Sequence, residues 1–297
     1  MAEPKKELHL GCESLPKARD FWQYNRFVVA RLSEVLAVVE GLAPLAFAEP
    51  WDNVGLLLEP VPVAVAAPVR CVLLTIDLSE EVVAEAEQLG ATLVIAYHPP
   101  IFQGLKRLRS SQPSERLVLR CASAGIAVFS PHTALDASPE GVNVWLTEAF
   151  GAGQRGPCLP SALDSRYGQG RFVHLDRAIS LSDAVAAVKR QLGLSQLRVC
   201  AAEAHAGEAS AIRTIAVCAG AGGSLFEKLS HFDLLVTGEM RHHDVRSRAL
   251  GGGSVILSEH THTERGFLPV LAERLRATLG SVTFHVSQCD REPLSLR

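Results

Sequence analysis

The segment CVLLTIDLSEEVVAEAEQLGATLVIAYHPP (residues 71–100) decides the fold class. Its first six residues form an apolar, β-rich run, and Asp77 or Ser79 can then cap a helix that ends at Gly90. A second apolar strand follows and stops at His98, where two prolines begin the next loop. A strand, a helix and another strand in this order are typical of an α/β sheet.

The same alternation continues along the chain. Further helices are predicted at residues 27–39, 113–124, 139–149, 224–229, 242–250 and 263–279, and further strands at 126–129, 214–218, 233–236, 255–257 and 282–286. Residues 151–170 are rich in Gly, Pro and Ser and predict a linker. We therefore predict a two-lobed α/β body with an N-terminal extension (1–29), a first lobe (30–150), this linker and a second lobe (171–297).

Composition excludes several classes of protein. The 297 residues are 47% hydrophobic and 21% charged, which indicates a sizeable core and argues against intrinsic disorder. The net charge of −3 gives no sign of direct nucleic-acid binding. No apolar run approaches the ~18–20 residues that span a membrane.

The acidic Glu3, Glu7 and Glu13 argue against a secretory signal or mitochondrial transit peptide, and seven cysteines without a CxxC pair favour reduced thiols. A soluble cytoplasmic protein is expected.

Residues that can bind metals follow three of the predicted strands. His98 ends the first, Asp136 lies in the loop after the second, and His260 follows the third with Glu264 four residues later. Ligands in α/β sheets bind beyond the carboxyl ends of strands, and residues four apart share one helix face. Nitrogen and carboxylate ligands suit Zn, Mn, Fe or Ni. Spacing alone does not show that the loops meet, so hydrogen-bonding loop residues remain the alternative interpretation.

Several blocks of sequence resemble the signatures of one family. They are WDNVG (51–55), YHPPIF (97–102), SPHTALD (130–136), TGEMRHHD (237–244), EHTHTER (259–265) and DREPL (290–294). Together they resemble the NIF3-like (NGG1-interacting factor 3-like) family, whose bacterial members are often labelled GTP cyclohydrolase I type 2. The resemblance covers about residue 30 to the C-terminus, and the YHPPIF and EHTHTER blocks look most like the animal branch.

The resemblance implies a metal site between two α/β lobes. It carries His98, Asp136, His260 and Glu264 over as ligands of a dinuclear divalent-metal centre, with Glu264 as the bridge between the metals. It also implies assembly as a homodimer or a larger ring. The identity of the metal stays open among Zn, Mn, Fe and Ni, and one or two ions are expected.

Other positions are assigned by the same resemblance. His132 matches a family histidine that lies beside the metals and supports or weakly binds them. If the protein is an enzyme, His132, Glu239 or His243 is expected to handle protons in the pocket. Bacterial relatives usually carry a second ligand histidine where this chain has Tyr97, and a phenol is a poorer ligand. We expect Tyr97 at the rim of the pocket, leaving one metal position with one ligand fewer. Residues 151–170 are too short for the small domain that many relatives insert there.

Two functions remain open. The first is a regulatory protein of the animal type, a transcriptional corepressor that acts through a protein partner such as a signalosome subunit, in the cytoplasm and also the nucleus. In that case the metal site is retained from the family and has a structural role. The second is a dinuclear metal-dependent hydrolase, GTP cyclohydrolase-like or phosphoester-type, acting on a small nucleotide-like substrate. The predicted fold is compatible with both functions, so the residues of the site must distinguish between them.

Overall fold

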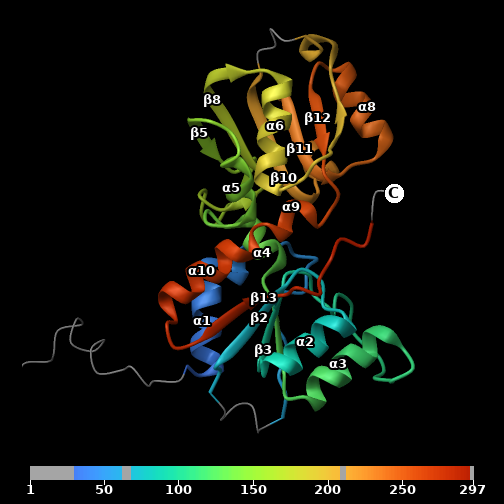
Figure 1. The fold of residues 1–297 in the computed structure, drawn as a ribbon. Coiled ribbons are helices and arrows are strands. Elements are labelled where there is room, and N and C mark those ends of the chain that lie inside the picture. The colour runs from blue at the N-terminus through green and yellow to red at the C-terminus, as the bar shows by residue number, and fades with distance from the viewer. Residues whose placement is uncertain (1–29, 62–67, 208–211, 295–297) are drawn as a thin grey trace, which may run out of the picture.

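The computed structural model describes residues 30–61, 68–207 and 212–294, and these form two lobes, each built on one sheet (Figure 1). The predicted mixed α/β class with two lobes is confirmed. The predicted N-terminal extension, and the first residues of the helix expected at 27–39, lie outside the described residues. No helix in the described part of the chain is long and apolar enough to cross a membrane.

The first lobe is a five-stranded sheet with helices on both faces. The strand order is β1 (Gly55–Leu58), β4 (Ala127–Ser130), β3 (Leu93–Ala96), β2 (Cys71–Thr75) and β13 (Thr283–Val286). Strand β1 is antiparallel to β4, whereas the others pair in parallel. One face packs against α1 (Leu32–Leu42) and α10 (Leu268–Thr278), and the other against α2 (Glu80–Leu89) and α3 (Pro113–Ser123). Burial on both faces explains why the inner strands β2, β3 and β4 are almost entirely apolar.

The second lobe is a six-stranded mixed sheet. Its order is β5 (Gly153–Gly156), β8 (Arg171–Ile179), β10 (Ile212–Ala221), β11 (Leu234–Glu239), β12 (Ser254–Leu257) and β9 (Arg198–Cys200). Helices α5 (Val142–Thr147) and α6 (Leu181–Leu192) pack on one face, and α7 (Gly223–Phe226) and α8 (His242–Leu250) on the other. The central three strands are parallel, so their carboxyl ends share one edge of the sheet.

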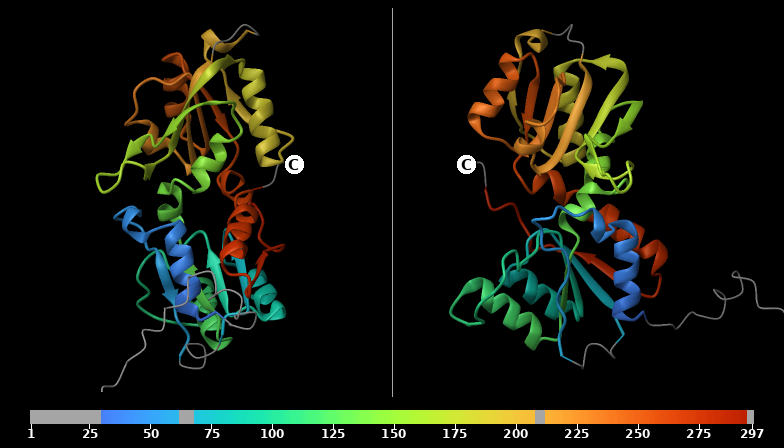
Figure 2. Two further views of the ribbon diagram at one scale, coloured as in Figure 1. Left: turned by 90° about the vertical axis from the view of Figure 1, so that its left-hand side faces the viewer. Right: turned by 180° about the vertical axis from the view of Figure 1, so that it is seen from behind.

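Short elements complete the chain. They are η1 (Leu45–Phe47), α4 (His132–Ala137), β6 (Leu159–Pro160), β7 (Gly168–Gln169), η2 (Glu203–His205) and α9 (His262–Arg265). Strands β6 and β7 pair with each other in a separate two-stranded sheet. One apolar core runs through both lobes, from α1 and α10 to α5 and α6. The lobes stack one above the other in both views of Figure 2.

The helix predicted after β2 forms as expected, for the expected reasons. Ser79 caps α2 by accepting a hydrogen bond from the Val82 amide at 3.3 Å. Gly90 ends the helix with φ 65°, a left-handed conformation that glycine adopts without strain. Helix α6 repeats this arrangement between Ser180 and Gly193, although the sequence analysis did not predict it.

The division of the chain between the lobes differs from the prediction. The last strand was expected in the second lobe, but β13 pairs with β2 in the first sheet, and α10 packs beside it. The predicted linker holds β5, an edge strand of the second sheet, and the β6–β7 pair. The helix predicted over 263–279 is two helices, α9 and α10, because the chain passes from one lobe to the other between them.

Candidate metal centre

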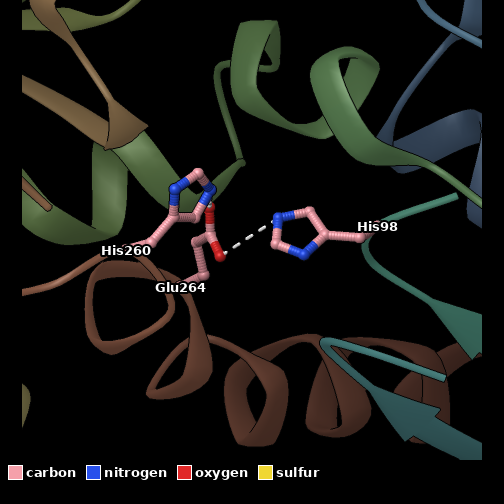
Figure 3. Close-up of side chains that lie close together, drawn as sticks. All are labelled: His98, His260 and Glu264. Carbon is pink, nitrogen blue, oxygen red and sulfur yellow. Dashed lines mark ion pairs between the residues drawn. The ribbon is translucent and has the colours of Figure 1, made fainter. Parts of the chain in front are cut away.

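Three predicted ligands from both lobes converge on one point. His98 follows β3 of the first lobe, whereas His260 and Glu264 follow β12 of the second. Each offers one ligand atom, and these atoms all lie within 4.8 Å of one another. The Nε2 atoms of His98 and His260 lie 3.4 and 3.5 Å from the two carboxylate oxygens of Glu264 (Figure 3). The carboxyl ends of the two parallel strand sets therefore face a common site.

The other ring nitrogen of each histidine is held by a carboxylate. His98 Nδ1 lies 2.9 Å from Asp77 Oδ1, and His260 Nδ1 lies 2.5 Å from Glu239 Oε1. Burial opposes ionisation of Asp77, but the hydrogen bond from His98 and the charges of His98, Arg265 and His260 together outweigh it and lower the pKa of that carboxyl. A carboxylate on the far nitrogen fixes the ring and its tautomer, which is the usual support for a metal-ligating histidine. Both Nε2 atoms are thereby directed toward Glu264.

The set fits a divalent cation on two further observations. Glu264 is buried, with 3% of its side chain exposed, and its Oε2 atom has no hydrogen-bond partner. A buried carboxylate oxygen that accepts no hydrogen bond is costly unless a positive charge lies beside it, and a metal ion or a protonated His98 could supply that charge. Gly220 leaves the space open, because a Cβ there would come within 2.8 Å of His260 Nε2 and 2.9 Å of Glu264 Oε1. Burial lowers the pKa of His98, but Asp77 and Glu264 raise it to about 10, which shows how negative the site is.

Asp136 lies beside this group and has a different partner. It lines the same cavity as His260 and Glu264, but it is not among the residues whose ligand atoms all lie within 4.8 Å of one another. Its carboxylate accepts a hydrogen bond from the Tyr97 hydroxyl. Burial raises the pKa of Asp136 to about 6. Tyr97 is itself 1% exposed, so it forms part of the core instead of standing at the rim.

His132 is placed next to the three ligands. Its ring centroid lies 5.3 Å from that of His98, and its Nδ1 atom lies 2.8 Å from Asp52 Oδ1. The Asp52 side chain has no exposed surface and also accepts hydrogen bonds from the Thr133 amide and hydroxyl. Burial opposes ionisation of Asp52, but these hydrogen bonds outweigh it and lower the pKa of the carboxyl. His132 is thus held in one orientation beside the cluster.

The other two residues assigned to proton handling have different surroundings. Glu239, at the end of β11, contacts His260 and is half exposed. His243 lies on α8, is exposed, and stacks edge-on with His242. It does not line the cavity that holds His132 and Glu264. The structure therefore joins Glu239 to the metal cluster, and it places His243 on the surface of the second lobe.

Comparisons with known proteins identify the family of this chain. The family model described as Duf34/NIF3 (NGG1p interacting factor 3) matches residues 30–293. The chain belongs to the NIF3 family. It is 38% identical to NIF3-like protein 1 of Drosophila melanogaster, over 91% of this chain and 90% of that protein. It is 33% identical to NIF3-like protein 1 of Rattus norvegicus, over 89% of this chain and 92% of that protein.

A solved structure shares the NIF3 fold. The crystal structure of a Bacillus cereus protein related to NIF3 superposes with a TM-score of 0.78, covering 91% of this chain and all of that chain. The two sequences are 20% identical, so this likeness concerns the fold alone. The two-lobed α/β body is thus a shared architecture.

The NIF3 site opens into a cavity of about 320 Å³ that carries aromatic side chains. Trp51 and Phe102 line it with 59% and 48% of their surfaces exposed, and their rings lie 6.0 Å apart. Lys228 lines the same cavity, as do His260 and Glu264. A small molecule that reaches the three ligands therefore meets apolar rings and one cationic side chain.

Sequence reasoning missed two of the supporting carboxylates in this NIF3 chain. Asp77 follows the end of β2 as His98 follows the end of β3, so the same rule of strand ends could have identified it. Asp52 lies in a loop far along the chain from His132, and nothing in its spacing signals the contact. Only folding of the loop against α4 brings these two residues together.

Proposed function

We propose that this NIF3-family chain is a metal-dependent hydrolase that acts on a small, planar, negatively charged substrate of the nucleotide type. The observation that carries the proposal is the buried carboxylate of Glu264, whose Oε2 atom accepts no hydrogen bond, between two histidines whose far nitrogens are held by carboxylates. This arrangement has the donor types and the supporting hydrogen bonds of a divalent-metal site. It also faces a cavity large enough for a ligand.

The residues supply the parts that hydrolysis requires. A divalent cation held by His98, His260 and Glu264 would polarise a substrate oxygen and lower the pKa of bound water. His132 lies beside the ligands with one nitrogen held by Asp52, so the imidazole is oriented to take or give a proton at its other nitrogen. Fixing of the imidazole by a buried carboxylate also favours one tautomer.

The cavity supports the proposed class of substrate. Trp51 and Phe102 present exposed aromatic surface on which a flat ring can stack. Lys228 offers a positive charge to an anionic group on the same molecule. A phosphorylated heterocycle combines both features.

The experiment is a turnover assay with metal-loaded protein. Protein reconstituted with Mn²⁺ or Zn²⁺ is incubated with GTP, other nucleotides and a panel of phosphoesters, and products are separated by chromatography. We expect turnover that is lost in Glu264→Gln, and a raised KM with a smaller change in kcat in Trp51→Ala. Stoichiometric metal binding without turnover of any compound would overturn the hydrolase proposal and leave the metal site in place.

Family membership favours a second candidate. The matching family is described as NGG1p interacting factor 3, and two animal members are 38% and 33% identical to this chain. We propose, as the alternative, a regulatory protein that acts as a transcriptional corepressor through a protein partner in the nucleus. Direct binding of a purified signalosome subunit, measured for wild type and for Glu264→Gln, tests it. Equal binding by wild type and Glu264→Gln would show that the corepressor role does not depend on the metal. If neither protein binds the subunit, the corepressor proposal is wrong.

A further inference from the structure

We infer that residues 287–294, here named the C-terminal strap, position the metal ligands of the two lobes against each other. The inference rests on the proposed metal site. The strap contains the block DREPL, which resembles a family signature and has no part in the chemistry above. It follows β13 of the first lobe and runs up beside the second lobe (Figure 1).

Asp290 links the two lobes through one carboxylate oxygen. Its side chain is 3% exposed, and Oδ2 accepts hydrogen bonds at 2.7 Å from the Ile76 amide and at 2.7 Å from the Arg265 guanidinium. The carbonyl of Ile76 in turn accepts a hydrogen bond from the His98 amide at 3.0 Å. Arg265 directly follows Glu264. Asp290 therefore links Ile76, which is hydrogen-bonded to His98, with Arg265, which is next to Glu264.

Glu292 makes a similar contact beside the remaining ligand. Its Oε2 atom accepts hydrogen bonds from the Thr261 amide at 3.2 Å and the Thr261 hydroxyl at 2.6 Å. Thr261 directly follows His260. Arg265 also donates to the Thr261 hydroxyl at 3.0 Å, so the contacts of Asp290 and Glu292 are connected. Each of the three ligands thus has a neighbour that is tied to the strap.

The strap is fixed to the first lobe before it reaches the second. The Ser287 amide donates to the Leu74 carbonyl at 2.8 Å, which continues the pairing of β13 with β2. The Gln288 amide donates at 2.9 Å to Glu85 on α2. A segment that is anchored in one lobe and contacts the ligand loop of the other sets the distance between them. Metal ligands need this precision, because their bonds are only about 2.0–2.2 Å long for zinc.

The experiment compares strap variants with a matched control. Apparent Kd for Mn²⁺ and the visible absorption spectrum of the Co²⁺-loaded protein are measured for wild type, Asp290→Asn and Glu292→Gln. We expect Asp290→Asn to weaken binding at least about tenfold and to change the Co²⁺ spectrum, and Glu292→Gln to act in the same direction. The control is Asp233→Asn, which makes the same chemical change where a carboxylate accepts two second-lobe amides, at 2.9 and 2.8 Å. It should leave both readouts unchanged.

A double mutant tests whether Asp290 acts through Arg265. Arg265→Gln and Asp290→Asn break the same link, so their effects on Kd should not add. Lower thermal stability with wild-type Kd and spectrum in both strap variants would overturn the inference and leave the metal site intact. If Asp290→Asn does not fold, Glu292→Gln alone decides, because it changes only the contacts of Glu292 with Thr261 and with the Leu294 amide and leaves Asp290 in place. Failure of wild type to bind either ion would overturn the metal site itself.

Discussion

His98 Nε2 lies 3.4 Å from Glu264 Oε2, and the two residues belong to loops of different lobes. A cation that binds both atoms therefore holds the lobes together as well as completing the site. Binding to the folded protein alone adds about 2.7 kcal/mol to the free energy of unfolding at a metal concentration 100 times Kd. The stability of this protein and the occupancy of its site are thus linked.

The first prediction concerns this linkage. Glu264→Gln should lose most of the bound metal, since the substitution removes the buried charge that faces both histidines. His132→Gln should lose less, because His132 lies beside the ligands and is held by Asp52. Elemental analysis of purified protein measures metal per chain, and thermal unfolding with and without EDTA should show a drop in Tm for wild type but not for Glu264→Gln. Equal metal content in both variants would contradict this.

The second prediction tests the space beside the ligands. Gly220→Ala places a methyl group within 2.8 Å of His260 Nε2, at a residue with φ 63°. Gly193→Ala is the matched control, because its φ is 67° but no atom lies within 4 Å of the added carbon. Both variants should lose about 1–2 kcal/mol of stability from the left-handed backbone. Only Gly220→Ala should also weaken Mn²⁺ binding, by about tenfold or more. The measurements are chemical denaturation and metal titration.

The third prediction is a pH dependence of stability at Asp233. Burial opposes ionisation of this carboxyl, but hydrogen bonds from the Arg213 and Thr214 amides outweigh it, so its pKa in the folded protein lies below 3.8. Because the pKa of Asp233 is lower in the folded than in the unfolded protein, its ionised form stabilises the folded state at any pH above the unfolded-state pKa. This stabilisation disappears as the pH falls through the folded-state pKa. Asp233→Asn should therefore destabilise the protein at pH 7 and have little effect below pH ~3. Urea midpoints across this range measure it.

The control for this prediction is a carboxylate whose main partner is an exposed arginine. The pKa of Asp164 is also lowered, by its hydrogen bonds with Arg166, but the Arg166 side chain is 76% exposed. Solvent screens exposed pairs, so Asp164→Asn should leave the urea midpoint almost unchanged at every pH. A similar loss of stability in both variants would show that the loss at Asp233 does not arise from its two hydrogen bonds with the amides of β10.

The fourth prediction concerns assembly. We propose that the chain forms a homodimer or a larger ring. Apolar side chains such as Leu250 on α8 and Val199 on the edge strand β9 are exposed, at 79% and 43%. Light scattering at micromolar concentration should give a mass at least twice 31.9 kDa. A mass of one chain would contradict the proposal, and substitution of Leu250 by Glu should lower the mass if this surface is the interface.

Much of the local structure could be predicted from the sequence. The limits of α2 follow from Ser79 and Gly90, because a hydroxyl that caps the first turn and a glycine that accepts φ 65° act over a few residues. His98, His260 and Glu264 were identified because a polar residue after an apolar strand lies at the carboxyl edge of a sheet. The family blocks then singled out these residues among others of the same type.

Other features depend on partners that are distant in the sequence, and only the tertiary structure decided them. Nothing local distinguishes β13 from a strand of the second sheet, because backbone hydrogen bonds form equally well with either neighbour. Asp136 contacts the buried Tyr97 hydroxyl because the core closes around both. Asp290 meets Ile76 and Arg265 because the strap crosses between the lobes. The sequence by itself determined the elements and the types of ligand, whereas packing determined which side chains meet, because burial and long-range pairing are properties of the whole fold.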